Sequence, residues 1–366
     1  MHLTLTLKLR PTTEQAAALR ETMEQTNAAC TAIAATAFRT HTANKIRLQH
    51  LVYADVRATF GLSAQMTVRA ISKVVDAYKR DKSVCPTFRP HGAVAYDPRI
   101  LSWKGEDHVS LLTLRGREIL PVIVDDYHRP RLRSLRGQAD LITRDGQFYL
   151  AVVVDVPEPP PLQPVDWLGV DLGTVNIAAD SDGQTYSGGQ VNGLPKRHAK
   201  PGQRLQKKGT KSAKRLLQKR RRKEQRFARH ENHRMTKQRV TKAPGTRRGI
   251  ALEDLTGIRD RMTVCKAQRR RQHSWAFHQL RECVMYKAAL AGVPVPCVDP
   301  RTTSRTCPVC GRIDKRNRPD QASFRCIGCG FAGPADTIAA GNIARRAAVN
   351  PPDAGPLPEA PASSAL

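Results

Sequence analysis

A carboxylate interrupts the apolar stretch Trp167-Leu-Gly-Val-Asp171-Leu-Gly173-Thr-Val-Asn-Ile-Ala-Ala-Asp-Ser-Asp-Gly183. Residues 167–172 are typical of a buried strand, residues 175–179 of a second strand, and Asp182-Gly183 of a hairpin turn. An ionised carboxylate at Asp171 is costly to desolvate unless a cation, hydrogen bonds or open solvent compensates its charge. We favour a metal ion as that compensation. The alternative is a strand-end Asp that caps a turn or faces water.

Composition gives the first indication of a partner. The 366 residues predict two to four domains, and 61 Lys and Arg against 32 Asp and Glu give a net charge of +29, which favours a polyanionic partner. The sequence has no apolar run long enough to cross a membrane and no signal peptide at its N-terminus, so we expect a cytoplasmic protein with no membrane partner. Four of the nine cysteines form one cluster and the other five are scattered, which suits a reducing compartment better than a disulfide framework.

The spacing of apolar residues changes twice along the N-terminal part of the chain. Residues 3–9 alternate as a strand does, and helical patterns follow at 14–38 and at 44–78, with a break at Gly61. A period of two then predicts a β-barrel or sandwich. Its short strands are expected at 94–96, 109–114, 119–124, 139–143 and 147–154. If the first strand joins that sheet, the helices are inserted within the β domain, and Pro157–Pro161 is a stiff linker after it.

A strongly basic segment follows, between Lys196 and Arg248. It contains 22 Lys and Arg but only two acids, Glu224 and Glu231, and so contributes +20 of the net +29. Residues 214–229 are helix-forming but have too few apolar side chains for a wide core stripe. A solvated face is the alternative, but this excess charge repels itself without an anion, so we favour nucleic acid bound through its phosphates. The candidate contacts are Arg204, Lys207, Lys208, Lys214, Arg215, Lys219, Arg220, Arg221, Arg222, Lys223, Arg226 and Arg229.

Two further acids follow the basic segment, each at the border of a predicted element. Residues 248–255 predict a strand that ends in Glu253, residues 275–290 a helix, and residues 293–298 another strand. Asp336 lies in the first turn of a helix predicted at 335–346. The Pro- and Ala-rich tail beyond Val349 is expected to be disordered.

Four cysteines have the spacing of a zinc site. Cys307 and Cys310 are separated by two residues, as are Cys326 and Cys329, and fifteen residues lie between the pairs. Four thiolates complete the tetrahedral shell of zinc and leave no open position. We therefore expect one structural Zn²⁺.

Each of the three acids has an ordinary alternative when taken alone. Asp171 is explained as a turn residue, Glu253 as an exposed strand-end acid, and Asp336 as a helix N-cap. In a basic chain, three carboxylates at element borders also suit a site for two Mg²⁺ ions. One ion would activate water and the other would stabilise the leaving oxygen of a phosphodiester.

Several motifs in this order resemble TnpB, the transposon-encoded RNA-guided nuclease family ancestral to type V CRISPR effectors. They are Gly169-Val-Asp171-Leu-Gly173, His230-Glu-Asn-His-Arg, Gly249-Ile-Ala-Leu-Glu253-Asp-Leu-Thr-Gly257, Trp275-Ala-Phe-His-Gln-Leu-Arg281, Thr303-Ser-Arg-Thr-Cys307-Pro-Val-Cys310-Gly, Phe324-Arg-Cys326 and Ala335-Asp336. The resemblance covers nearly the whole chain.

The resemblance implies a multidomain α/β and β-barrel protein. It would have a RuvC-like nuclease domain of ribonuclease H fold, with Asp171, Glu253 and Asp336 as catalytic metal ligands. The implied ranges are a β-barrel wedge domain (1–10 and 80–160), a helical recognition domain (11–79), the nuclease domain (161–300 and 331–349), a zinc ribbon (301–330) and the tail (350–366). The implied partners are a guide RNA derived from the transposon end, with one protein chain per RNA, and target double-stranded DNA.

One position departs from the family pattern. The family has Asp-x-Asn-Ala-Ala after the third acid, whereas Ile338 stands here in place of that Asn. The departure puts a secondary polar contact in doubt, but not the metal ligands. Because all three acids are present, we favour an RNA-guided DNA endonuclease over a non-cleaving RNA-guided regulator or a strand-transfer transposase. A compact type V CRISPR effector is a variant of the first hypothesis.

Overall fold

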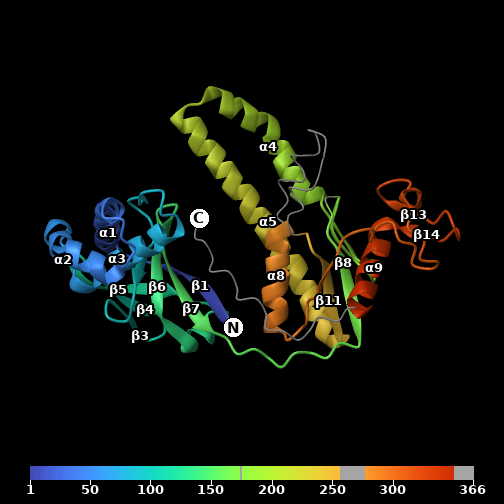
Figure 1. Ribbon diagram of the computed structural model, residues 1–366, viewed down its shortest axis with the longest axis horizontal. Coiled ribbons are helices and arrows are strands. Elements are labelled where there is room, and N and C mark those ends of the chain that lie inside the picture. The colour runs from blue at the N-terminus through green and yellow to red at the C-terminus, as the bar shows by residue number, and fades with distance from the viewer. Residues whose placement is uncertain (174, 256–276, 350–366) are drawn as a thin grey trace. The chain divides into compact units, whose positions relative to one another are not determined.

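The computed structural model describes residues 1–173, 175–255 and 277–349, and they fall into two compact units (Figure 1). The first is Met1–Pro157 and the second begins at Glu158. The boundary therefore lies at the predicted Pro-rich linker. The predicted disordered tail at 350–366 lies outside the described residues. No described helix combines the length and the apolar character needed to cross a membrane.

The first unit contains a seven-stranded antiparallel sheet in the order β2-β6-β7-β1-β5-β4-β3. Its strands are β1 (His2–Leu9), β2 (Val94–Tyr96), β3 (Leu101–Lys104), β4 (His108–Thr113), β5 (Gly116–Ile123), β6 (Leu135–Arg144) and β7 (Gln147–Asp155). The edge strands β2 and β3 are consecutive in the chain. Tyr96 Oη of the edge strand β2 donates to Leu112 O of β4, the neighbour of the other edge strand β3, at 3.0 Å. This bond links the two ends of the sheet, which is therefore nearly closed.

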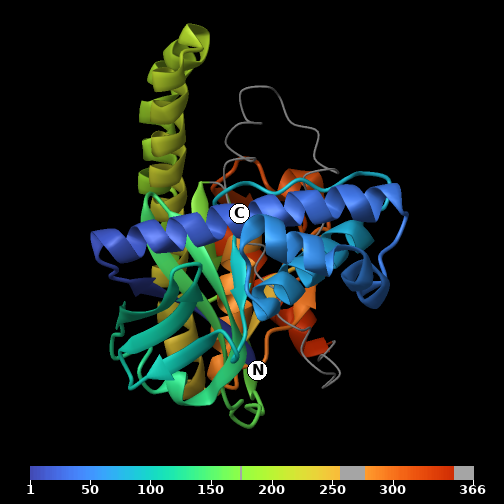
Figure 2. The same ribbon diagram turned by 90° about the vertical axis from the view of Figure 1, so that its left-hand side faces the viewer.

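Three helices lie between β1 and β2 in the chain and share the core of that sheet (Figure 2). They are α1 (Thr13–Arg39), α2 (Lys45–Phe60) and α3 (Ala64–Arg80). Thr12 and Gln15 form a capping box at the start of α1. Gly61, at φ 64°, ends α2 at the predicted break. Because β1 pairs with both β5 and β7, the helices are inserted into the β domain as predicted.

The second unit is built on a five-stranded sheet in the order β10-β9-β8-β11-β12. The strands are β8 (Asp166–Asp171), β9 (Asn176–Asp180), β10 (Thr185–Ser187), β11 (Arg248–Glu253) and β12 (Cys297–Val298). β8, β11 and β12 are parallel, whereas β9 and β10 are antiparallel to their neighbours.

The strand predicted at 293–298 is wrong for its first four residues. Pro294 and Pro296 have no N–H to donate. Their carbonyls still accept from the backbone N–H groups of Ile250 and Leu252, both at 3.0 Å. The segment therefore lies along β11 with bonds in one direction only, and a regular strand forms only at 297–298.

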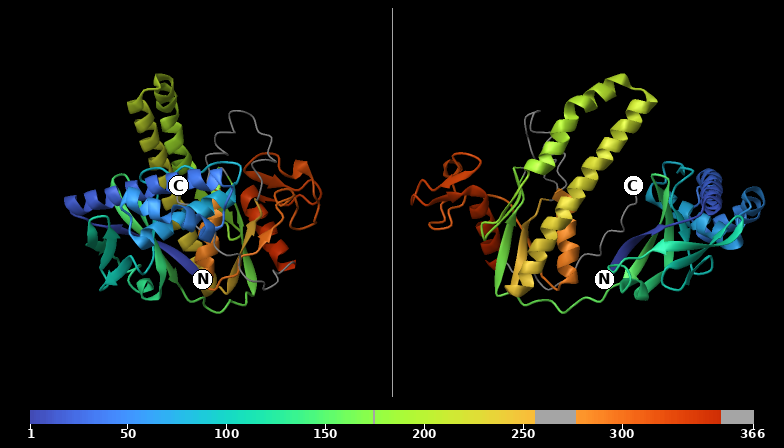
Figure 3. Two further views of the ribbon diagram at one scale, coloured as in Figure 1. Left: turned by 60° about the vertical axis from the view of Figure 1, so that its left-hand side comes forward. Right: turned by 180° about the vertical axis from the view of Figure 1, so that it is seen from behind.

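Helices cover both faces of the second sheet. The helices are α4 (Gly189–Lys208), α5 (Lys211–Gly245), α8 (Phe277–Leu290) and α9 (Ala335–Val349); Trp275, where a helix was predicted to start, lies outside the described residues. Ile250 and Leu252 of β11 pack with side chains of α5 and α8, whereas Ala251 packs with Ile343 of α9. Alternate residues of the strands therefore face opposite helical layers. Figure 3 shows α4 and α5 running side by side as a long helical hairpin.

A glycine allows α9 to approach β8 closely. A Cβ at Gly169 would lie 1.9 Å from the carbonyl oxygen of Ala340 and 2.7 Å from the backbone nitrogen of Ala344. Both atoms belong to backbone, so neither can rotate away as a side chain would. No side chain larger than hydrogen fits at residue 169 without moving α9 away from the sheet.

We therefore expect Gly169→Ala to destabilise the second unit by about 1–3 kcal/mol or more, because the added methyl group overlaps with helix backbone. The matched control is Gly341→Ala in the same helix, where nothing lies within 4 Å of the added Cβ. That change should instead stabilise the helix by about 0.5–1 kcal/mol. Thermal or urea unfolding of the two variants measures the difference. Equal stability of both variants would contradict this account of the packing.

Candidate functional site

Two of the three predicted acids end neighbouring parallel strands on the same face of the sheet. Asp171 is the last residue of β8 and Glu253 the last of β11, and the register pairs Val170 with Leu252 immediately before them. Gly169 and Ala251, two residues earlier on each strand, face α9. Because strand side chains alternate, both carboxylates lie on the α9 face as well.

The third acid, Asp336, is the second residue of α9. It therefore lies inside the first turn and does not occupy the N-cap position that was its alternative explanation. Its carboxylate accepts from Asn176 Nδ2 at 2.9 Å and from Arg318 Nη2 at 3.2 Å. These two partners come from β9 and from the segment between the cysteine pairs, so Asp336 joins α9 to both.

Burial and the neighbouring acids raise the pKa of Asp171 to about 7. The largest cause is desolvation, followed by the charges of Glu253 and Asp336, while Arg318 opposes them. Desolvation also raises the pKa of Glu253, which is only 8% exposed, although a hydrogen bond from Thr303 lowers it. The charges of Glu253 and Asp336 thus act on Asp171, and the positive charge of Arg318 does not offset its burial and their repulsion.

This group of carboxylates fits a hard cation. Carboxylate oxygens are the ligands that Mg²⁺ prefers, and a divalent ion would relieve both the burial cost and the mutual repulsion. The three carboxylates are not close enough for all their nearest oxygens to lie within 4.8 Å of one another. Among the described residues, only the four cysteines form a metal-ligand group that compact.

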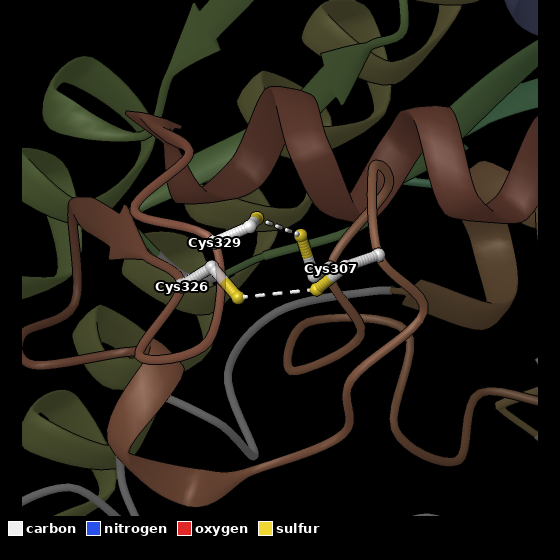
Figure 4. A group of neighbouring side chains, drawn as sticks. Cys307, Cys326 and Cys329 are labelled. Carbon is white, nitrogen blue, oxygen red and sulfur yellow. Dashed lines mark hydrogen bonds between the residues drawn. The ribbon is translucent and has the colours of Figure 1, made fainter.

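The four predicted cysteines lie together, with every sulfur within 4.8 Å of the others (Figure 4). Sγ of Cys307 is 3.6 Å from that of Cys329, and Sγ of Cys310 is 3.5 Å from that of Cys326. Four sulfurs about 2.3 Å from a tetrahedral zinc are separated by about 3.8 Å, so the cluster can hold such an ion. The segment between the pairs includes a short 3-10 helix (Lys315–Asn317) and β13 (Ser323–Arg325), and β14 (Ala332–Pro334) follows the second pair.

Ile338, which departs from the family pattern, packs against this cysteine-containing segment. It is 8% exposed and shares a small apolar cluster with Cys307, Phe324 and Cys326. The departure therefore replaces a polar side chain with one that extends the contact between α9 and the cysteine cluster.

The basic segment forms the hairpin of α4 and α5. Eleven of the twelve predicted contact residues are exposed, and Arg220 is half-buried, with an Nη1 atom that has no hydrogen-bond partner. The two acids are used within the protein, since Glu224 pairs with His198 and Glu231 with Arg234, each at 2.7 Å. Arg222 has a further interaction; for the other eleven, the described part of the chain provides no carboxylate partner. The hairpin therefore presents largely uncompensated positive charge.

Three site residues were not predicted from the sequence. Thr303 donates to Glu253, Asn176 donates to Asp336, and Arg318 forms an ion pair with Asp336. Thr303 begins the motif at 303–311 and Asn176 lies three residues after the motif at 169–173, so their nearness to these motifs was the only sequence signal for them. Arg318 lies in an irregular segment among other cations, and nothing in the local pattern distinguishes it.

Two family models match parts of the chain: "Probable transposase" (OrfB_IS605) at residues 151–243 and "Cas12f1-like, TNB domain" at residues 277–343. The Cas12f1 CRISPR-associated endodeoxyribonuclease of Syntrophomonas palmitatica is 28% identical over 253 residues, covering 63% of this chain and 50% of that protein. The TnpB-like protein MJ0751 of Methanocaldococcus jannaschii is 32% identical over 116 residues, covering 31% and 41%. The matched regions thus cover half or less of the length of these two curated relatives.

The solved structure of the mini-RNA-guided endonuclease CRISPR-Cas_phi3 is also similar. Its TM-score is 0.55 at 10% identity, with 97% of this chain and 94% of that chain covered, which shows a likeness of fold alone. The family models and the curated relatives confirm the resemblance to TnpB and Cas12f proteins.

The variant Asp171→Asn tests whether the charge of Asp171 destabilises the fold until a divalent cation binds. A group whose pKa rises from 3.8 to about 7 on folding stabilises the fold at low pH, and that stability is lost as pH rises through about 7. Without divalent ions, we therefore expect the variant to exceed the wild type in melting temperature by a few degrees at about pH 8 and by little at about pH 4. Saturating Mg²⁺ should stabilise the wild type more than the variant.

Thermal unfolding across that pH range, with and without Mg²⁺, measures both effects. Equal stabilisation of the two proteins by Mg²⁺, or a stability difference that does not change with pH, would contradict the proposed electrostatics.

Proposed function

We propose that this relative of TnpB and Cas12f proteins is an RNA-guided DNA endonuclease encoded by a transposon, which cleaves DNA beside a short flanking motif. The observation that carries the proposal is the grouping of Asp171 and Glu253 on one face of the second sheet with Asp336 at the start of α9, where the charges of Glu253 and Asp336 raise the pKa of Asp171. The names of the relatives support a nuclease of this class.

We assign the second unit as a RuvC-like nuclease of ribonuclease H fold. The support is its strand order, in which an antiparallel hairpin meets parallel strands at β8, with helices on both faces. Asp171 ends the first strand of that sheet and Glu253 ends the next parallel one. The first unit would then supply the wedge domain, through its sheet, and the recognition domain, through α1 to α3.

The three acids would hold two Mg²⁺ ions, which supply an activated water and stabilise the leaving oxygen of the phosphodiester. Asn176 and Arg318 hold the Asp336 carboxylate from two sides. Gly169 fixes the distance between α9 and β8, and so the distance between Asp336 and Asp171. These contacts keep the acids oriented before any ion or substrate binds.

The four cysteines would hold one zinc with a structural role, because four thiolates leave no position for water or substrate. The α4–α5 hairpin would bind phosphates of a guide RNA or of its duplex with the target strand. Uncompensated charge of this kind contacts phosphates and carries no sequence information. Sequence would instead be read by base pairing.

The proposed activity depends on RNA and on all three acids. Purified protein should cleave double-stranded DNA only with the RNA that co-purifies with it and a divalent metal, and the cleaved target should follow changes to the guide sequence. Asp171→Ala, Glu253→Ala and Asp336→Ala should each abolish cleavage but leave RNA binding largely unchanged, because none removes a cation of the hairpin. Gel assays and binding titrations measure the two effects.

Equal cleavage without RNA, or with an unrelated guide, would reject RNA guidance. Sequence-specific, guide-dependent DNA binding without cleavage by the wild type would instead favour a non-cleaving regulator.

Phosphate binding by the α4–α5 hairpin can be tested separately from cleavage. Replacing Arg221, Arg222, Lys223 and Arg226 together with Gln should weaken binding of all RNA sequences alike and reduce the slope of log affinity against log salt by up to about one unit per lost phosphate contact. Discrimination between matched and mismatched targets should persist. A comparison variant replaces four exposed cations of α1 to α3, Arg20, Arg39, Arg57 and Arg80, in the helices that we assign to the recognition domain. An equal loss of slope in that variant would show that the hairpin has no special share in phosphate binding.

A further inference from the structure

The Glu253 carboxylate is held by a residue from outside its own sheet. Thr303 Oγ1 donates to Glu253 Oε1 at 2.7 Å, and both side chains are buried. The same hydroxyl lies 3.0 Å from the carbonyl oxygen of Pro300. A hydroxyl has one proton, and an ionised carboxylate is the stronger acceptor. The proton therefore points at Glu253 whenever that acid is charged.

Thr303 lies in the segment 299–306, which connects β12 to the first cysteine pair. Helix α9 holds this segment at several points. Asn342 Nδ2 donates to the carbonyl oxygens of Thr303 and Thr306, both at 2.8 Å. Arg346 donates to Asp299 O at 2.6 Å and to Thr302 Oγ1 at 3.1 Å. The backbone on both sides of Thr303 is thus fixed to the helix that carries Asp336.

The residue before Thr303 has a strained backbone. Thr302 has φ 63°, in the left-handed region, and is β-branched, so its side chain disfavours this conformation. Such a residue persists only where the surrounding contacts over-determine it, and such residues cluster at functional sites. Here the strained turn directs the next side chain, Thr303, at an acid fifty residues earlier in the chain.

We propose that Thr303 is a positioning residue that orients Glu253 for metal binding, with the segment 299–306 as its support. The inference rests on the proposed metal-dependent function. An outer hydrogen bond of this kind orients a metal-ligating carboxylate, and its loss commonly costs about 10–100-fold in metal affinity. The hydroxyl also occupies one oxygen of Glu253, which leaves the other free for the ion.

The chain offers a matched control in the same segment. Thr306 Oγ1 donates to Thr302 O at 2.9 Å, whereas the hydrogen bond to Glu253 comes from Thr303. Thr303→Val and Thr306→Val each remove one hydroxyl and keep the shape of the side chain. Thr303→Ser restores the hydroxyl without the methyl group. The three variants separate the hydrogen bond to Glu253 from the packing and rigidity of the segment.

The test measures Mn²⁺ binding to the RNA-free 366-residue chain by electron paramagnetic resonance, with Glu253→Gln as the background. Thr303→Val should weaken binding about 10-fold or more, whereas Thr303→Ser should remain within about 2-fold of wild type and Thr306→Val should match it. All variants should keep one zinc per chain, which shows that the cysteine cluster is intact. Thr303→Ala replaces the valine variant if that variant does not fold.

Unchanged Mn²⁺ binding in Thr303→Val would overturn the inference while the metal site stands. Equal weakening in Thr306→Val would also overturn it, because rigidity of the segment would then be the cause. No difference between wild type and Glu253→Gln would reject the metal site itself, and with it the proposed function.

Discussion

The second unit is organised around the repulsion between carboxylates that are wholly or partly buried. Asp171 and Glu253 follow apolar strands, where an ionised acid is costly, and the start of α9 adds Asp336 to the same face. This unfavourable electrostatic energy is tolerated because α9 packs closely against β8 at Gly169, where no larger residue fits. Stability obtained from the packing of α9 thus offsets an unfavourable grouping of charge. Such grouping is the common signature of a site that binds a cation.

Much of this arrangement could be predicted from local patterns. The apolar runs before Asp171 and Glu253 predicted strands that end near these acids, and the spacing of the four cysteines predicted their cluster. Contacts between distant segments could not be predicted. Thr303 reaches Glu253 because α9 holds the segment 299–306 that contains it. Arg318 reaches Asp336 from an irregular loop. The prolines at 294 and 296 prevented residues 293–296 from forming the regular strand that their apolar pattern predicted. A short β3 was missed because its alternation spans only four residues.

The helical hairpin illustrates a different relation between sequence and structure. Its charge was visible in composition, but composition did not show how the two acids are used. Glu224 joins α5 to α4 through His198, and Glu231 pairs with Arg234 on its own helix. Glu224 therefore helps to hold the hairpin together, and apart from Arg222 the predicted contact residues have no carboxylate partner in the described part of the chain. A polyanion that binds there meets a preformed helical backbone, so the ordering entropy that opposes binding comes mainly from the exposed side chains.

The position of β1 at the centre of the first sheet has a consequence for synthesis of the protein. Leu3 pairs with Val154 and Leu5 with Val152, so the residues of β1 find these partners only after about 150 further residues have been made. Helices α1 to α3 depend on local contacts and can form while translation continues. The apolar face of β1 must wait exposed until β7 has emerged. Because non-local pairing slows folding, the nascent chain is most prone to aggregation, and most dependent on chaperones, during this interval.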